Sequence, residues 1–469
     1  MNRLTLRILK TWMAFVFPML LTVACSKDND QAELHFAVPA VYLPGPATTV
    51  TVDFWTVNTA DVSVFSAPVG WTIKVDVAAS KLSITSPAAE PIAGAEKPEL
   101  SGVVTLYVYP TSGTPSTASL YVSQSTLEDL SSQQSNCYIL SKADCSYSIP
   151  VRFKGETNEP LETVSVGLVW QSNNNLIRYI QMKDDKVSFY VAATDAKKLI
   201  EGNALLAAYD TNGAIIWTWH LWITDYTPAT DGRYMSRNLG AGSNKTETTD
   251  AILASYGLYY QWGRKEPFIG PLTYNCASGV DARMYDALGT RLTLTYAETS
   301  ATVGTTAYAQ QHPLVYILGT EASGYDWLTE AHKADLWGTT KTLNDPCPKG
   351  WHVPAQADFV GLTIADSHTA ADTDKLKKQY GWTLTNGTNS SFFLGAGRRS
   401  ALHGFISNVN TNNRPEPWIG CYWTSGTAAD NASTALYFTL DTEDASKSEL
   451  NLNASYPRAN GMQIRCVKD

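Results

Sequence analysis

The sequence predicts a mainly β, multidomain protein, with two N-terminal β-sandwich modules followed by an α+β domain. Short runs of β-branched and aromatic residues, divided by Gly, Pro and Ser, fill residues 33–226. Beyond them Gly and Asn become more frequent and helical patterns appear. The 469 residues are sufficient for two to four domains. We therefore expect domains at 33–126, 127–226 and 227–469.

The first module, residues 33–126, has the pattern of a β-sandwich. Its apolar runs alternate or are β-branched, and they recur at the short spacing that such folds show. The segment at 88–100, rich in Pro, Ala and Glu, predicts an exposed loop. The expected strands read TTVTVDFWTV, DVSVF, GWTIKVDV, KLSITSP, GVVTLYVYP and TASLYVSQ.

The second module, residues 127–226, ends in a predicted hairpin whose turn contains Asn212 and Gly213. The strand after this turn carries apolar residues on both faces, which predicts a central, covered strand. We interpret His220 on this strand as a hydrogen-bonded core residue rather than a metal ligand. The two faces hold Trp217, Trp219 and Leu221 on one side and Ile216, His220 and Trp222 on the other.

The third region, residues 227–469, mixes helical and strand patterns. Residues 224–234 contain Pro228 and Gly232 in a polar run and are the best linker candidate. Residues 249–263 and 354–365 have helical patterns, and the second begins at a proline, as helices often do.

The N-terminus predicts an export signal over residues 1–24. Three basic residues precede a short apolar run that ends at Cys25, and the run is too short to span a bilayer comfortably. A cysteine directly after Thr22-Val23-Ala24 resembles a lipoprotein signal, which implies lipidation of Cys25. The polar segment 25–32 would then be a tether and resembles the export signal of Bacteroidetes surface lipoproteins. An ordinary cleaved signal with a chance cysteine is the alternative.

Composition excludes some classes of function. The formal net charge of −9 and the pI of about 5.3 disfavour nucleic-acid binding, which needs a clustered basic surface. The sequence contains no HExxH, CxxC, complete Walker A or GxSxG motif. We therefore expect a non-enzymatic protein without a cofactor.

A series of ordered blocks in the third region resembles a known family. Together they resemble the Fibrobacter succinogenes major paralogous domain, which is related to the C-type lectin-like fold. The first module resembles a BACON-type or immunoglobulin-like module, and the whole layout resembles fimbrillin-like lipoproteins. The blocks are RYMSRNLGA, YGLYYQWGRKEPF, GYDWL, NDPCPKGWHVPAQADF, FFLGAGRRS, GCYWTSG, ALYFTL and NGMQIRCVKD.

Six cysteines remain after Cys25, an even number that permits disulfides in an oxidising compartment. The lectin-like resemblance implies a disulfide between Cys347, just before the expected helix, and Cys466, on the final strand. Cys137 and Cys145 are expected to pair locally across a turn. Cys276 and Cys421 are the remaining couple.

The same resemblance raises the question of calcium-dependent sugar binding. Such sites need several converging oxygen ligands, and the Glu-Pro-Asn and Trp-Asn-Asp motifs that supply them in lectins are absent. We therefore expect no metal. Trp418, Tyr422 and Glu416 lie in a loop-rich segment and are the candidate ligand-binding residues, with packing in the core as the alternative for the aromatic ones.

These observations predict a lipid-anchored protein of the outer membrane that faces the cell exterior. The resemblance implies adhesion to a glycan or a protein, or a role with fimbrial subunits at a fimbrial tip. A glycan-capture accessory of a polysaccharide-utilisation system is the alternative, and an enzyme on a lectin-like scaffold is a third.

Overall fold

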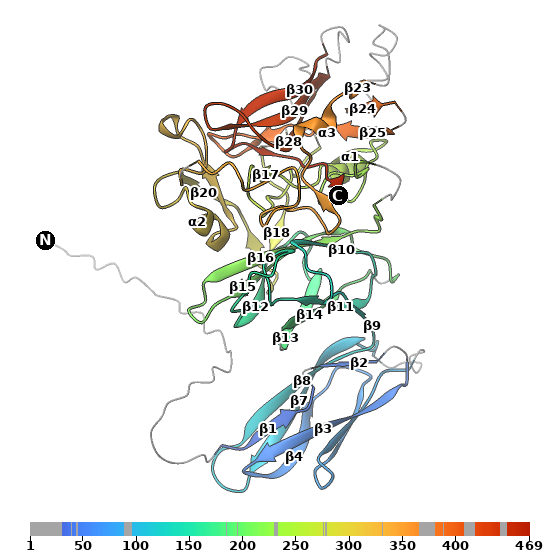
Figure 1. Ribbon diagram of the computed structural model, residues 1–469. Coiled ribbons are helices and arrows are strands. Elements are labelled where there is room, and N and C mark those ends of the chain that lie inside the picture. The colour runs from blue at the N-terminus through green and yellow to red at the C-terminus, as the bar shows by residue number, and fades with distance from the viewer. Residues whose placement is uncertain are drawn as a thin grey trace, which may run out of the picture.

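A computed structural model describes residues 31–469, except 39, 44–45, 89–95, 184, 195, 229–232, 275, 277–278, 331, 365–379, 388, 408–417 and 441–447. The described chain is mainly β, so the predicted fold class is confirmed. Figure 1 shows a separate sandwich at one end, a second in the middle and the C-terminal region at the other end. No described helix is both long and apolar enough to cross a membrane.

The first sandwich consists of two four-stranded sheets, ordered β1-β3-β6-β5 and β2-β8-β7-β4. This is the ABED/CFG order of immunoglobulin-like domains, with β2 added in parallel beside the last strand. The predicted immunoglobulin-like sandwich is therefore confirmed. Its strands are β1 (Glu33–Phe36), β2 (Ala40–Tyr42), β3 (Thr49–Val57), β4 (Thr59–Ser66), β5 (Thr72–Asp76), β6 (Lys81–Thr85), β7 (Ser101–Pro110) and β8 (Ser116–Ser123).

Alternation along the strands builds the core of this sandwich. Val104, Leu106 and Val108 on β7 are fully buried between the sheets. The intervening side chains face outward, so Tyr109 is 42% exposed. The result is a core that belongs to this module alone, formed by residues such as Val52, Phe54, Val62, Leu82, Ile84, Leu106 and Leu120.

The second sandwich repeats this arrangement. Its sheets are ordered β13-β14-β11-β9 and β10-β16-β15-β12, and β10 lies parallel to β16 as β2 does to β8. One pairing differs, because β9 runs parallel to β11 whereas β1 runs antiparallel to β3. The strands are β9 (Thr126–Asp129), β10 (Cys137–Leu140), β11 (Cys145–Pro150), β12 (Ser165–Gln171), β13 (Ile177–Lys183), β14 (Lys186–Val191), β15 (Gly202–Tyr209) and β16 (Ile215–Ile223).

Strand β16 is covered on both faces, as predicted. Trp217, Trp219 and Leu221 pack in the core of the second sandwich. Trp222 faces the other way, into a larger core built mainly by the C-terminal region. His220 is buried and hydrogen-bonded, so its interpretation as a core histidine is also confirmed.

The C-terminal region contains small sheets and short helices. The sheets are ordered β17-β31-β26-β27, β20-β21, β22-β32, β23-β24-β25 and β28-β29-β30. Its strands are β17 (Tyr260–Gln261), β18 (Met284–Tyr285), β19 (Arg291–Leu292), β20 (Thr295–Glu298), β21 (Val315–Leu318), β22 (Trp351–His352), β23 (Thr363–Ile364), β24 (Gly381–Asn386), β25 (Asn389–Leu394), β26 (Arg398–Arg399), β27 (Ile406–Ser407), β28 (Trp418–Thr427), β29 (Ala432–Leu440), β30 (Leu450–Pro457), β31 (Gly461–Met462) and β32 (Val467–Lys468).

The helices of this region are shorter than their sequence patterns. Helix α1 covers Thr249–Ser255, and Gly257 just after it has a φ of 72°, the left-handed conformation that ends helices. Helix α3 covers only Gln356–Phe359, because Val360 is already extended and Gly361 has a φ of 81°. The third α-helix described is α2 (Thr306–Gln311), and η1 (Glu321–Ser323) is a 3-10 turn.

The C-terminal region is joined to the second sandwich by strand pairing as well as by packing. Strands β18 and β19 extend the sheet of the second sandwich beyond β12, with Tyr285 paired to Gln171. The Gln310 side chain of α2 donates to the carbonyl oxygen of Ile216 at 2.6 Å. The second sandwich and the C-terminal region therefore share one hydrophobic core, whereas the first sandwich has a core of its own.

Candidate functional site

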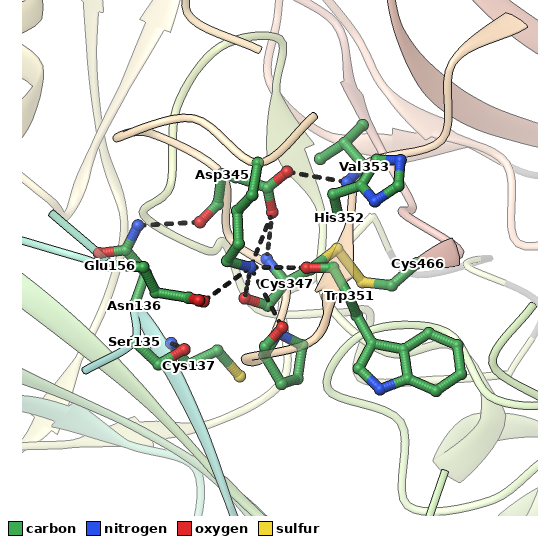
Figure 2. A network of polar contacts seen from close by, with 12 residues as sticks. Ser135, Asn136, Cys137, Glu156, Asp345, Cys347, Trp351, His352, Val353 and Cys466 are labelled. Carbon is green, nitrogen blue, oxygen red and sulfur yellow. Dashed lines mark hydrogen bonds and ion pairs between the residues drawn. A yellow bond between two sulfur atoms is a disulfide. The ribbon is translucent and has the colours of Figure 1, made fainter. Parts of the chain in front are cut away.

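The segment from Asn344 to Pro354 combines a cysteine and a histidine, but its geometry is that of a structural turn. The buried carboxylate of Asp345 accepts hydrogen bonds from the backbone N–H groups of Cys347 and Val353, both at 2.8 Å (Figure 2). Burial raises the pKa of Asp345 above its ordinary value. These two bonds fold the chain around one side chain.

A lysine completes this turn. The ammonium of Lys341 donates to the carbonyl oxygens of Cys347 and Trp351, both at 2.6 Å, and to that of Pro348 at 3.1 Å. It also forms ion pairs with Glu156 at 3.4 Å and with Asp345 at 3.5 Å. Since Glu156 belongs to the second sandwich, the turn anchors one region to the other.

The predicted disulfide between Cys347 and Cys466 is present, with an S–S distance of 2.05 Å. It joins the turn to the last strands, where β22 pairs with β32. His352 is hydrogen-bonded to Asp469 at 2.7 Å. Within the part of the chain that the structure describes, no three His, Cys, Asp or Glu side chains form a group suited to a metal ion.

The predicted disulfide between Cys137 and Cys145 is wrong. Both are free, buried thiols, and they begin strands that belong to opposite sheets of the second sandwich. The Cys137 thiol lies 3.3 Å from Nδ1 of His220, and the Cys145 thiol lies 3.4 Å from the Thr126 hydroxyl. Burial raises the pKa of both thiols. Cys421 is also a free thiol, so the suggested Cys276–Cys421 pair is wrong as well.

The aromatic residues predicted as ligand contacts are part of the core. Tyr422 is fully buried, and its hydroxyl donates to the carbonyl oxygen of Leu394 at 2.7 Å. Trp418 is 8% exposed and packs edge-on against Tyr380, with ring centroids 4.6 Å apart. The prediction that Trp418 and Tyr422 contact a ligand is therefore wrong, because neither ring is exposed. Glu416 and Cys25 lie outside the described residues.

A different set of aromatic residues lines an open cleft of about 860 Å³ on the outer face of β28, β29 and β30. Tyr437 and Tyr456 lie on this face with ring centroids 6.0 Å apart. The wall opposite is the β26–β27 segment, from which Phe405 is 45% exposed. We call this site the Tyr437 cleft; its lining includes Tyr325, Arg398, Ser400, Leu402, Phe405, Ile419, Tyr437, Thr439, Ser455, Tyr456 and Asn460.

Strand alternation explains why these side chains face the cleft. Phe438 points into the core, where its ring would lie 2.1 Å from a side chain placed at Gly420. Its neighbour Tyr437 therefore points outward, opposite Cys421 in the strand register. The block ALYFTL already contains this alternation, so the sequence held a signal for Tyr437 that favoured it over Tyr422.

One cation shapes the chemistry of the cleft. The guanidinium of Arg398 lies over the ring of Tyr456, 5.1 Å from its centroid. Burial raises the pKa of the Cys421 thiol to about 11 and also raises the pKa values of Tyr437 and Tyr456. The cleft therefore presents neutral phenols, one guanidinium and several hydroxyl and amide groups. Aromatic surface with a few convergent polar groups is typical of ligand-binding clefts.

No protein-family profile and no curated protein matches this chain. Solved structures with partial similarity include the titin Ig tandem domains A164-A165, at 10% identity, 41% of this chain, 97% of that chain and a TM-score of 0.13. The D00-D0 domain of intimin matches 40% of this chain and 96% of its own chain, at 11% identity and a TM-score of 0.17. The human desmocollin-1 ectodomain matches 47% of this chain and 46% of its own chain, at 11% identity and a TM-score of 0.14. TM-scores this low do not establish a shared fold. We therefore assign the fold class from the strand order of the sheets. The described residues form a multidomain β protein whose first module is an immunoglobulin-like sandwich.

Proposed function

We propose that this protein is a surface-exposed adhesion lipoprotein without enzymatic activity, and that its C-terminal region binds a glycan in the Tyr437 cleft. The observation that carries the proposal is the pairing of two tyrosine rings with polar groups in one open concavity. Sugar rings present apolar C–H faces that pack on aromatic rings, and their hydroxyls need hydrogen-bonding partners. Arg398, Ser455 and Asn460 are suited to provide them.

A glycan array with the purified protein tests this proposal. Tyr437→Ala and Tyr456→Ala should each weaken binding of the preferred glycan about tenfold or more, since stacking and hydrogen bonding are both lost. Tyr109→Ala is the matched control, because Tyr109 is a partly exposed tyrosine on the first sandwich. Binding should persist with a chelator. Loss of binding in the control alone, or no binding of any glycan by the wild type, would contradict the proposal.

The anchoring part of the proposal rests on the sequence around Cys25. Acyl chains on this cysteine would hold the protein at the outer membrane through their buried methylene groups. Cys25→Ala should move the protein from the membrane fraction to the soluble one, and mass spectrometry of the mature N-terminus should show the lipid in the wild type. An unmodified N-terminus at another residue would support the ordinary secretion signal instead.

A further inference from the structure

The described lining of the Tyr437 cleft contains a single charged side chain, and it is a cation. Arg398 lies on β26, opposite Ser407 of β27, and its side chain is partly exposed. The other described lining residues are aromatic, apolar, hydroxyl-bearing or amide side chains, with no carboxylate among them. The described lining therefore carries a positive charge, although the whole chain has a formal net charge of −9.

Two other arginines of the C-terminal region use their guanidinium groups within the protein, and Arg398 does not. Arg399, the next residue, is fully buried, with a guanidinium nitrogen 2.6 Å from a carboxylate oxygen of Asp281. Arg458 forms an ion pair with Asp326 at 3.4 Å. Within the part of the chain that the structure describes, Arg398 forms no ion pair, and its side chain donates no hydrogen bond to an oxygen atom.

The groups beside Arg398 do not neutralise it. Its guanidinium lies over the Tyr456 ring, 5.1 Å from the centroid, a contact that uses none of its N–H donors for a conventional hydrogen bond. Burial raises the pKa of the Cys421 thiol to about 11 and raises the pKa values of Tyr437 and Tyr456, so all three are neutral at pH 7. The exposed carboxylate of Glu449 adds to the rise in the pKa of Tyr437, but no ion pair joins it to Arg398 in the described structure.

We propose that the glycan of the Tyr437 cleft is acidic and that its carboxylate or sulfate group pairs with Arg398. A guanidinium suits both anions, because its N–H donors form a planar fork. With the anion held beside Tyr456, the sugar ring that carries it packs on Tyr437, whose ring centroid is 6.0 Å from that of Tyr456. Such a ligand presupposes the glycan binding proposed above and specifies its charge.

Matched glycan pairs on the array, which differ only in the acid group, test the proposal with the purified protein. Oligogalacturonates and their methyl esters test a carboxylate, and sulfated galactan oligosaccharides and their desulfated forms test a sulfate. The acidic member of at least one pair should bind about tenfold or more tightly than its neutral partner. Neutral glycans that bind as tightly as their acidic partners overturn this proposal but leave glycan binding intact. No binding of any glycan overturns both.

Two arginine variants separate the charge of the cleft from charge elsewhere on the surface. Arg398→Gln removes the charge but keeps a polar side chain, so it should weaken binding of the acidic glycan about tenfold and leave its neutral partner nearly unchanged. Arg291→Gln is the matched control, since Arg291 is exposed on β19 of the same region and is not among the described residues that line the cleft. Equal weakening in the two variants, or unchanged binding of the acidic glycan by Arg398→Gln, overturns the proposal.

The salt dependence of the wild type provides a second measurement, which does not depend on the folding of a variant. Raising the salt concentration from about 50 mM to about 500 mM screens charge, so binding of the acidic glycan should weaken about threefold or more. Binding of the neutral partner should stay nearly constant. Equal salt dependence of the two partners overturns the pairing with Arg398. Thermal unfolding of both variants, without ligand, checks that each is folded.

Discussion

The two sandwiches share a strand order but differ in what covers them. In the first, many outward side chains meet solvent, and Trp55 and Phe65 are 55% and 67% exposed; Tyr121, which stacks on Tyr179 of the second sandwich, is an exception. In the second, the outward face of β15 and β16 is buried, with Trp222 fully inaccessible. The same strand order thus gives one module with its own core and another that shares a core with the C-terminal region. Figure 1 shows the second sandwich between the first sandwich and the C-terminal region.

The cause lies in the residue patterns of the strands, as one strand from each sandwich shows. Strand β3 reads TVTVDFWTV, and it is buried on one face only. Strand β16 reads IIWTWHLWI, and it is buried on both. A strand that is apolar on two faces needs two partners, and the C-terminal region supplies the second. We infer that the second sandwich and the C-terminal region unfold together and that the first sandwich unfolds separately.

The largest expected effect is removal of the Cys347–Cys466 disulfide. The bond closes a loop of 119 residues, so Cys466→Ala should lower the free energy of unfolding of the C-terminal region by about 4–5 kcal/mol in the chain-entropy description. Hydrogen exchange read by mass spectrometry should show lost protection there and in the second sandwich. Peptides of the first sandwich should keep their protection. Reductant should lower the protection of the wild type and leave that of the variant unchanged. An equal loss of protection in both sandwiches and the C-terminal region would contradict separate unfolding of the first sandwich.

Trp222→Ala addresses the shared core directly. The side chain is fully buried between β16 and the C-terminal region, so the loss should be about 3–5 kcal/mol. Urea unfolding with hydrogen exchange at each concentration should show both regions weakened together. If only the second sandwich lost stability, the two regions would not form one cooperative unit.

The sequence predicted the strands better than the sites, for a physical reason. Period-two alternation reports which face a residue occupies, so the two-sided burial of β16 and the core position of His220 were predictable. Exposure depends also on what packs across from a face, which a single sequence does not show. Tyr422 illustrates this, because it occupies the inward face of β28 in a segment whose Gly and Asn content suggested loops. The Tyr437 cleft needs β28–β30 and the distant β26–β27 segment together.

The cysteines show the same limit. The resemblance to a lectin-like fold correctly implied the Cys347–Cys466 bond across more than a hundred residues. Short separation wrongly suggested a bond between Cys137 and Cys145, because proximity along the chain does not reveal that the intervening turn crosses from one sheet to the other.

Lowering the pH should destabilise the second sandwich, because this sandwich contains the buried His220. Burial lowers the pKa of His220 to about 3, whereas an unfolded histidine has a pKa of about 6.5. The unfolded state therefore binds a proton between these values and the folded state does not, so stability is lost as the pH falls below 6.5. At pH 5 the loss from this residue is about 2 kcal/mol, at about 1.4 kcal/mol per pH unit.

The fold explains why this histidine stays neutral. Its Nε2–H donates to the side-chain oxygen of Asn203 at 2.9 Å, and the amide of Asn203 donates to the Gly240 carbonyl oxygen at 2.9 Å. Nδ1 is left to accept from the Cys137 thiol. Unfolding of His220→Gln, measured from pH 7 to 5, should lack this part of the pH dependence, and the first sandwich should not differ between the two proteins. An unchanged slope in the variant would contradict the assignment.

The smallest expected effect is on the exposed face of the first sandwich. Trp55 is 55% exposed and stacks on His35, itself at the surface, with centroids 5.5 Å apart. Trp55→Ala should therefore change the free energy of unfolding by less than about 0.5 kcal/mol, in contrast to Trp222→Ala. Urea unfolding of the two variants side by side measures the difference. A loss at Trp55 close to that at Trp222 would mean that the outer face of β3 is covered in solution, and the contrast between the two sandwiches would then not hold.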